Sequence, residues 1–342
     1  MSRRVLTLLL AAVLAVGLAL AAAVTPVPYV SLGPGPAYDT LGSVGGVPVI
    51  TVTGRQTYPT DGHLDLTTVG VTDRITLAEA LQGWLSQSTE VVPREVVFPP
   101  DQTSQQTDQQ NARDMVQSQD AATSAALLSL GVPAKTTVSV ASVQKGAPAD
   151  GKLRTGDVLT SVDGKPVTSS DALRRLIGAR APGAQVTIGY LRAGTAGSAL
   201  LTTIPSKEAN PRALVGISPD EKNDFPVKVT IALRDVGGPS AGLMFALGII
   251  DKLDPESLTG GRSIAGTGEI SSDGTVGPIG GIAEKLIGAR RRGATAFLVP
   301  TTNCADAKVH PPAGLRLIKV QTLKGALAEL AALRGGAPTT PC

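Results

Sequence analysis

The sequence predicts an α+β fold, because segments with the period of strands and segments with the period of helices both recur along its 342 residues. Residues 62–69 alternate apolar and polar side chains, as a half-buried strand does, whereas residues 76–85 and 115–130 have helical spacing. An uncharged apolar segment precedes all of these. After Gly131 the chain is predicted to form short strands and one helix, at residues 138–143, 157–162, 170–177 and 184–191.

The composition limits the classes of function. Aromatic residues make up only 3% of the chain, so its cores must consist mainly of Val, Leu, Ile and Ala. The formal net charge is +3, and Lys and Arg are scattered along the chain, which gives no reason to expect nucleic-acid binding. The two histidines, His63 and His310, and the two cysteines lie far apart and form no metal-binding pattern. We therefore expect no metal and no other cofactor.

The apolar N-terminal segment is long enough to cross a bilayer. Residues 5–24 are rich in Leu, Ala and Val, and about 20 such residues span the hydrocarbon core. Ser2-Arg3-Arg4 precedes the segment and the next charge is Asp39, so the positive-inside rule places the N-terminus in the cytoplasm. We expect a single-pass protein of the cell membrane whose remaining residues are extracytoplasmic. A cleaved signal peptide, processed at Ala21-Ala22-Ala23, is the alternative, and it also exports the rest of the chain.

The two cysteines, Cys304 and Cys342, suit such a compartment. They could pair in an oxidising space. Whether their geometry permits a disulfide is not decided by the sequence, because the bond requires closely approaching and correctly directed Cβ atoms.

Two linking segments lack a regular apolar period. Residues 25–61 are rich in Gly and Pro and predict a connector with short extended pieces, such as residues 47–52. Residues 99–111 are rich in Gln and Asp, and we expect a mobile loop there.

Ser240 lies in a glycine-rich turn, residues 234–243, between an apolar run at residues 227–233 and an apolar helical pattern at residues 243–250. Glycine adopts backbone angles that other residues resist, and it lets a substrate carbonyl approach the main chain. Because Ser240 would open the following helix, free N–H groups and the positive end of the helix dipole could face an oxyanion. A serine hydroxyl still needs a base that takes its proton.

Residues 132–206 resemble a PDZ domain. The resemblance rests on the turn Gly146-Ala147-Pro148-Ala149, followed by Leu153-x-x-Gly156-Asp157 and Val162-Asp163-Gly164. PDZ domains bind an extended peptide, often a C-terminus, as an extra strand beside a helix, so the resemblance implies substrate capture. The family's Gly-Leu-Gly-Phe loop, which holds the peptide carboxylate, is not recognisable. A spacer that binds nothing is therefore the alternative.

Residues 225–333 resemble the proteolytic domain of the Lon proteases. Three motifs follow the family's order: Gly238-Pro239-Ser240-Ala241-Gly242, Gly266-Thr267-Gly268-Glu269-Ile270, and the segment 277–285, which ends in Glu284-Lys285. The resemblance implies that Ser240 is the nucleophile and Lys285 its general base. It also implies that Thr267 helps to orient the lysine and that Gly238, Pro239 and Ala241 have supporting roles.

Lys285 can act as a base at neutral pH only if its pKa is lowered, which burial can achieve. Its neighbours are apolar enough to make such burial an expectation: Ile279, Ile282, Leu286 and Ile287.

The resemblance also predicts the order of domains. In Lon, a strand like residues 64–69 and a helix like residues 115–130 precede the strand that leads to the serine. We therefore expect one protease domain, split by an inserted PDZ-like β-barrel or sandwich module and preceded by one transmembrane helix. The expected divisions are an anchor at 1–28, a connector with the first part of the protease domain at 29–131, the module at 132–206, the proteolytic core at 207–335 and a tail at 336–342.

The expected function is that of an ATP-independent serine endopeptidase with a Ser-Lys dyad. Its substrates would be exported or membrane proteins, captured by the module through C-terminal or extended segments. No Gly-x-x-x-x-Gly-Lys-[Ser/Thr] occurs in the sequence, so no P-loop is available for ATP. Because Lon proteolytic domains assemble into rings, the resemblance implies a homo-oligomer.

Two other functions stay open. Gly238 to Gly242 also satisfies the Gly-x-Ser-x-Gly pattern of α/β-hydrolases, and His310 would have to supply the histidine of such an esterase. The other alternative is a non-catalytic, membrane-anchored adaptor whose PDZ module captures exported chains.

Overall fold

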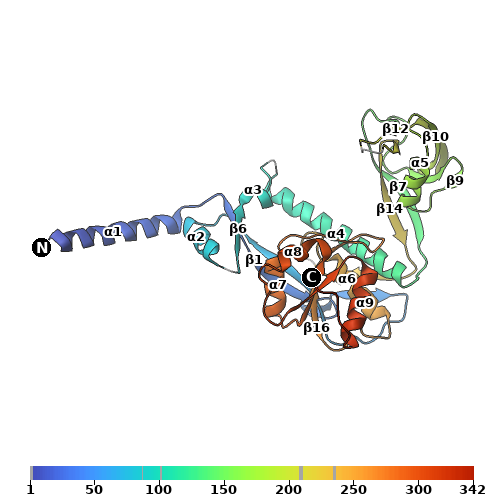
Figure 1. The fold of residues 1–342 in the computed structure, drawn as a ribbon. Coiled ribbons are helices and arrows are strands. Elements are labelled where there is room, and N and C mark those ends of the chain that lie inside the picture. The colour runs from blue at the N-terminus through green and yellow to red at the C-terminus, as the bar shows by residue number, and fades with distance from the viewer. Residues whose placement is uncertain (1–2, 87, 101, 208–210, 234–235) are drawn as a thin grey trace. The chain divides into compact units, whose positions relative to one another are not determined.

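The computed structural model describes residues 3–86, 88–100, 102–207, 211–233 and 236–342 (Figure 1). Ser2, Asp101, Arg234 and Asp235, which the sequence-based predictions include, lie outside the described residues. The chain forms two compact units. The first comprises residues 1–131 and 227–342, and the second comprises residues 132–226.

The first unit is a mixed α/β structure, in agreement with the predicted class. Its helices are α1 (Arg3–Val24), α2 (Leu77–Leu85), α3 (Arg94–Val97), α4 (Ser104–Ser129), α6 (Gly242–Leu253), α7 (Ile282–Arg291), η1 (Thr301–Asn303), α8 (Cys304–Ala307) and α9 (Leu323–Arg334). Its strands are β1 (Tyr29–Asp39), β2 (Ser43–Val44), β3 (Val47–Pro48), β4 (Ile50–Thr53), β5 (His63–Thr72), β6 (Glu90–Pro93), β15 (Lys228–Ile231), β16 (Ser263–Gly266), β17 (Glu269–Ile270), β18 (Val276–Gly277), β19 (Ala296–Pro300) and β20 (Arg316–Val320).

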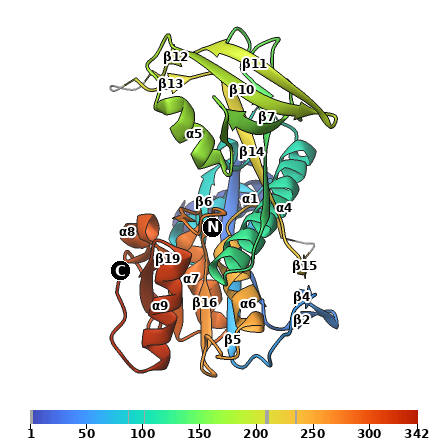
Figure 2. The same ribbon diagram turned by 90° about the vertical axis from the view of Figure 1, so that its right-hand side faces the viewer.

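The main sheet of this unit has the strand order β20-β19-β16-β5-β1-β6. β16, β19 and β20 run parallel to β5, whereas β1 and β6 form the antiparallel half. Helices α6 and α7 both pack against β5 (Figure 2). Helix α6 is apolar on all sides, and Met244 and Phe245 within it are fully buried. Such a helix belongs inside a core, and this one begins directly after the glycine-rich turn that contains Ser240.

Helix α4 corrects one prediction. The mobile loop expected at residues 99–111 is wrong from Ser104 onward, where the helix begins. Thr103 caps it: its hydroxyl accepts from the Gln106 N–H, and the Gln106 side chain accepts from the Thr103 N–H. This capping box satisfies two otherwise unpaired amides. Gln is also a good helix former, so the missing apolar period did not indicate a loop.

The second unit contains strands and one helix, as expected after Gly131. Its elements are β7 (Lys135–Val143), β8 (Val158–Val162), β9 (Lys165–Pro166), α5 (Ser170–Gly178), β10 (Gln185–Arg192), β11 (Thr195–Thr202), β12 (Ile204–Pro205), β13 (Ala213–Leu214) and β14 (Ile217–Asp224). The strands follow the order β11-β10-β8-β7-β14. The unit therefore includes two strands that come after residue 206.

Within the described residues, the first segment is helix α1 and the last residue is held by a disulfide. Helix α1 is long and apolar enough to cross a membrane, although a signal sequence near an N-terminus has the same character. At the other end, Cys304 and Cys342 form a disulfide, which settles the question that the sequence left open.

Candidate active site

Ser240 and Lys285 lie side by side, although 45 positions separate them in the sequence. Ser240 stands in the turn just before α6, and Lys285 lies in the first turns of α7. The Lys285 Nζ is 2.8 Å from the Ser240 Oγ. At this distance a charged ammonium donates to the hydroxyl, whereas a neutral amine can accept the hydroxyl proton.

Helix α4 forms two hydrogen bonds with the serine turn, the glycine-rich segment that contains Ser240. The Gly238 N–H donates to the Asn111 carbonyl at 2.9 Å, and the Ser118 hydroxyl donates to the Pro239 carbonyl at 2.9 Å. Gly238 has a φ of +82°, an angle that favours glycine. Asn111 lies in the part of α4 that was expected to be a loop. This residue therefore helps to position the serine turn.

The turn also offers main-chain amides next to Ser240. Ala241 is the N-cap of α6 and provides no side-chain cap. Within the part of the chain that the structure describes, the N–H groups of Ser240 and Ala241 donate to no other residue. Unpaired amides at the start of a helix are suited to a developing negative charge.

Thr267 connects the serine and the lysine. Its hydroxyl donates to the Ser240 carbonyl at 3.0 Å and accepts from the Lys285 Nζ at 3.1 Å. The Gly268 N–H donates to the same Ser240 carbonyl at 2.8 Å. Thr267 is fully buried, so its single hydroxyl proton has a fixed direction and its lone pair faces the lysine.

Lys285 is 3% exposed. This burial lowers the pKa of Lys285 to about 8, while the carboxylate of Glu269 acts in the opposite direction. The lowered value leaves a substantial neutral fraction of the amine near neutral pH, which an exposed lysine does not have.

The start of α7 fixes the direction in which Lys285 points. Gly281, the N-cap, has a φ of +66°, and a Cβ at this position would lie 2.5 Å from the Val69 Cγ2. Just before it, the Asn303 side chain forms two hydrogen bonds with the Ile279 main chain, one with its N–H at 3.0 Å and one with its carbonyl at 2.9 Å. The backbone that leads into the helix is thus held on two sides.

A cleft of about 540 Å³ opens at these residues. Its walls come from β1, β5, the serine turn and the segment before α7, and they include Thr67, Thr68, Val69, Pro239, Ala241, Gly280 and Gly281. Glu269 also lines this cleft and a neighbouring cavity of about 410 Å³ that contains Asp114. Glu269 lies inside one of the three motifs, although the sequence alone indicated no role for it.

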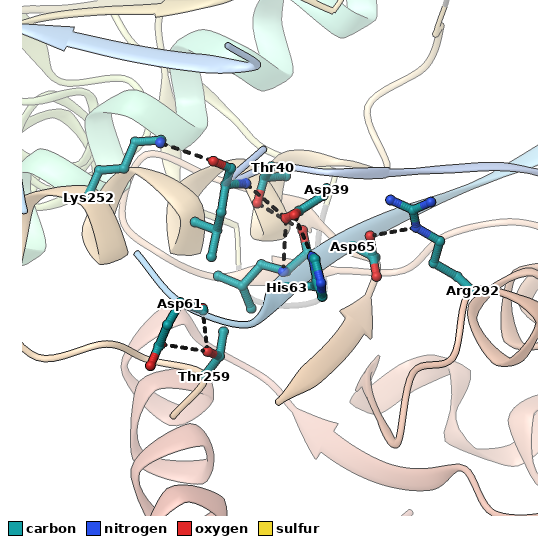
Figure 3. Close-up of polar contacts among 10 residues, drawn as sticks. Asp39, Thr40, Asp61, His63, Asp65, Lys252, Thr259 and Arg292 are labelled. Carbon is teal, nitrogen blue, oxygen red and sulfur yellow. Dashed lines mark hydrogen bonds and ion pairs between the residues drawn. The ribbon is translucent and has the colours of Figure 1, made fainter. Parts of the chain in front are cut away.

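The histidines lie elsewhere. His310 is exposed and is not among the residues that line the cleft. His63 bonds Asp39 through its Nδ1 at 2.7 Å, in a polar cluster that also contains Asp65 and Arg292 (Figure 3). Since β1 and β5 pair at Asp39 and Asp65, this cluster ties the two strands together outside the cleft. Among the described residues, no three His, Cys, Asp or Glu side chains form a group suited to a metal ion.

The second unit has a groove of its own, of about 410 Å³. One wall is helix α5, with Leu173 and Ile177, and the other is the segment 213–219. Gly216 in that segment has a φ of +76°, and a Cβ there would lie 2.1 Å from the Ala147 Cβ. This wall lies after residue 206, beyond the end of the module predicted from the sequence. A glycine between apolar residues was the available signal.

Comparison with known families finds two domain matches in this chain. Residues 215–331 match the Lon protease (S16) C-terminal proteolytic domain, and residues 111–203 match the PDZ domain. The first match contains Ser240, Thr267 and Lys285, and it indicates a serine peptidase domain.

Individual relatives match only in part. Lon protease 1 of Sorangium cellulosum is 37% identical over 127 residues, which are 36% of this chain and 15% of that protein. Lon protease 1 of Bacillus subtilis is 37% identical over 99 residues, which are 28% of this chain and 12% of that protein. The PDZ domain of an SdrC-like protein from Listeria innocua is 28% identical, with 24% of this chain and 92% of that one covered and a TM-score of 0.23. The chain thus spans only a small part of the curated relatives' length.

Proposed function

Because the chain carries a Lon-type (S16) proteolytic domain together with a PDZ domain, we propose that it is a serine endopeptidase with a Ser240–Lys285 dyad. The observation that supports this proposal most directly is the 2.8 Å distance between the Lys285 Nζ and the Ser240 Oγ inside a cleft. Burial of the lysine supports its role as the base, since a neutral amine is required for proton transfer.

The reaction would proceed in two halves. Neutral Lys285 accepts the Ser240 hydroxyl proton while the Oγ attacks the peptide carbonyl carbon, and the oxyanion is stabilised by the amides of Ser240 and Ala241. As the C–N bond breaks, Lys285 gives its proton to the leaving amine and an acyl-enzyme ester remains. Lys285 then takes a proton from water, which attacks the ester. As the ester C–O bond breaks, Lys285 returns this proton to the Ser240 Oγ and the second product is released. Thr267 would keep the amine directed at the serine throughout.

The other parts of the chain would deliver substrates to this site. We assign residues 1–28 to a membrane anchor, 29–131 and 227–335 to the protease domain, 132–226, the second compact unit, to the PDZ module and 336–342 to a tail. The N-terminus would be cytoplasmic and the protease extracytoplasmic, acting without ATP on exported or membrane proteins. The groove beside α5 would bind extended or C-terminal segments of these substrates, and the protease would assemble as a homo-oligomer.

Single substitutions test the dyad. In Ser240→Ala and Lys285→Ala, cleavage of an unfolded protein substrate should fall at least about a thousandfold, because members of one catalytic unit fail together. His310→Ala is the matched control and should cleave at the wild-type rate. An active Lys285→Ala variant, or an inactive His310→Ala variant with a wild-type melting temperature, would contradict the proposed dyad.

A further inference from the structure

Helix α2 has an apolar side that the fold does not use. Its exposed side chains Leu77, Leu81, Trp84 and Leu85 recur at the spacing of one helix face, and Leu85 is 88% exposed. The fold packs a different side, where Ala80 is fully buried. On that side a Cβ at Gly83 would lie 2.3 Å from the Val91 Cγ2 of β6. A soluble domain rarely exposes such a row of large apolar residues without a partner.

The position of α2 identifies this partner. The Leu77 N–H donates to the Thr25 carbonyl at 2.9 Å, and Thr25 is the first residue after α1. The Val27 N–H donates to the Ile75 carbonyl at 3.0 Å, and Pro26 pairs with Thr76. Figure 1 shows α2 beside the C-terminal end of α1. If α1 crosses a membrane, these bonds hold the first residue of α2 at the point where α1 emerges from it.

The residue types fit the boundary between lipid and water. Trp84 is the single tryptophan of a chain that is only 3% aromatic. It packs edge-to-face against Tyr29, with the ring centroids 5.6 Å apart. Trp and Tyr are enriched at membrane interfaces because each combines an apolar ring with a polar group. Val96 in the short helix α3 is also exposed, and α3 is joined to the same connector by the Arg94 N–H, which donates to the Pro28 carbonyl.

We propose that α2 is an interfacial helix that inserts Leu77, Leu81, Trp84 and Leu85 into the outer surface of the membrane crossed by α1. This inference rests on the proposed membrane anchor. An amphipathic helix binds a bilayer in this way by burying its apolar face at the boundary of headgroups and acyl chains. If α1 and α2 both contact lipid, the residues that join them at Thr25 and Thr76 are held at a fixed depth relative to the membrane surface. The β1–β6 edge of the sheet then lies next to the membrane surface.

The single tryptophan provides a direct test. The full chain is reconstituted into vesicles of phosphatidylcholine and phosphatidylglycerol, with either ordinary or brominated acyl chains. Because bromine quenches only a tryptophan that reaches the acyl region, Trp84 emission should be blue-shifted in both vesicles and strongly reduced in the brominated ones. Equal emission from the two vesicles would overturn the proposal, including the case in which Trp84 is covered by a second copy of the chain.

Extraction separates this inference from the anchor on which it rests. Alkaline carbonate should leave the protein in the vesicles if α1 spans them. Release by carbonate would overturn the anchor and the interfacial helix together, whereas retention without quenching would overturn only the helix.

Matched variants locate the contact. Leu81→Glu combined with Leu85→Glu should abolish most of the quenching, because charged side chains are unfavourable among acyl chains. Val309→Glu, at another exposed apolar position of the same unit, should leave the quenching unchanged. Both variants should cleave a short peptide at the wild-type rate. Undiminished quenching in the double variant would contradict the assignment of this face to lipid.

Discussion

The hydroxyl of Thr267 donates to the main-chain carbonyl of Ser240 at 3.0 Å, so the residue that carries the nucleophile is bonded to a side chain that also contacts Lys285. The carbonyl keeps a second donor, the Gly268 N–H, at 2.8 Å. Loss of the threonine hydroxyl should therefore leave the turn in place and affect mainly the lysine. This arrangement makes Thr267 a positioning residue whose contribution can be measured.

Thr267→Val should lower kcat about tenfold, the effect of losing one hydrogen bond worth about 1.4 kcal/mol, because the Lys285 amine is no longer held toward Ser240. Thr267→Ser keeps the hydroxyl and should retain most of the activity. Steady-state kinetics with a fluorogenic peptide measure both. If the valine variant loses stability but no kcat, the hydroxyl serves only the fold.

The pH dependence of cleavage should report the lysine. Burial lowers the pKa of Lys285 to about 8, and only the neutral amine can accept the serine proton. We therefore expect kcat/KM to increase with pH through about 8 and then to level off. A limb near 10, the value of an exposed lysine, would show that the amine is hydrated in the active enzyme.

Glu269→Gln should move that limb to lower pH. The Glu269 carboxylate raises the pKa of Lys285, so its removal favours the neutral amine. Burial and the nearby Asp114 raise the pKa of Glu269 itself, because both make the ionised form of this carboxyl less favourable. Asp220→Asn removes one exposed negative charge from the second unit and should leave the profile unchanged. A shift of equal size in both variants would point to net charge instead of the local contact.

Reduction of the disulfide should lower the melting temperature. The bond closes a loop across 38 positions, and a cross-link of this size stabilises by about 2–4 kcal/mol. The bonds of Asn303 to Ile279 do not involve the cysteines, so activity well below the melting temperature should persist. Thermal denaturation with and without a thiol reductant measures the effect, and Cys304→Ser/Cys342→Ser should not respond to the reductant. An unchanged melting temperature on reduction would contradict a stabilising role.

Removal of the second unit should separate capture from cleavage. Lys135 pairs with Asp224, so the unit's two ends leave it on adjacent strands and a short Gly/Ser bridge can replace residues 132–226. We expect short peptides to be cleaved at the wild-type rate, while KM for protein substrates increases because a tethering site is lost. Equal losses toward peptides and proteins would show that the unit shapes the active site.

The sequence by itself determined much of the local structure and indicated a Lon-type serine peptidase domain. The apolar helical pattern predicted at residues 243–250 lies within α6, which runs from Gly242 to Leu253. The strands and the helix predicted after Gly131 are also present. These features depend on apolar period, turn residues and motif order, all of which are encoded within short stretches of chain.

Only the tertiary structure decided which distant residues meet. The approach of Lys285 to Ser240, the bond from Asn111 to Gly238 and the cleft-lining place of Glu269 all join segments that are far apart in the sequence. Helix α4 shows the same limit. Its first turns are polar, so no apolar pattern predicted them. A cap at Thr103 stabilises these turns, and they lie beside the serine turn. Burial and desolvation arise from the packing of the whole unit. The lowered pKa of Lys285 and the unused apolar face of α2 beside α1 therefore emerge only when the chain is folded.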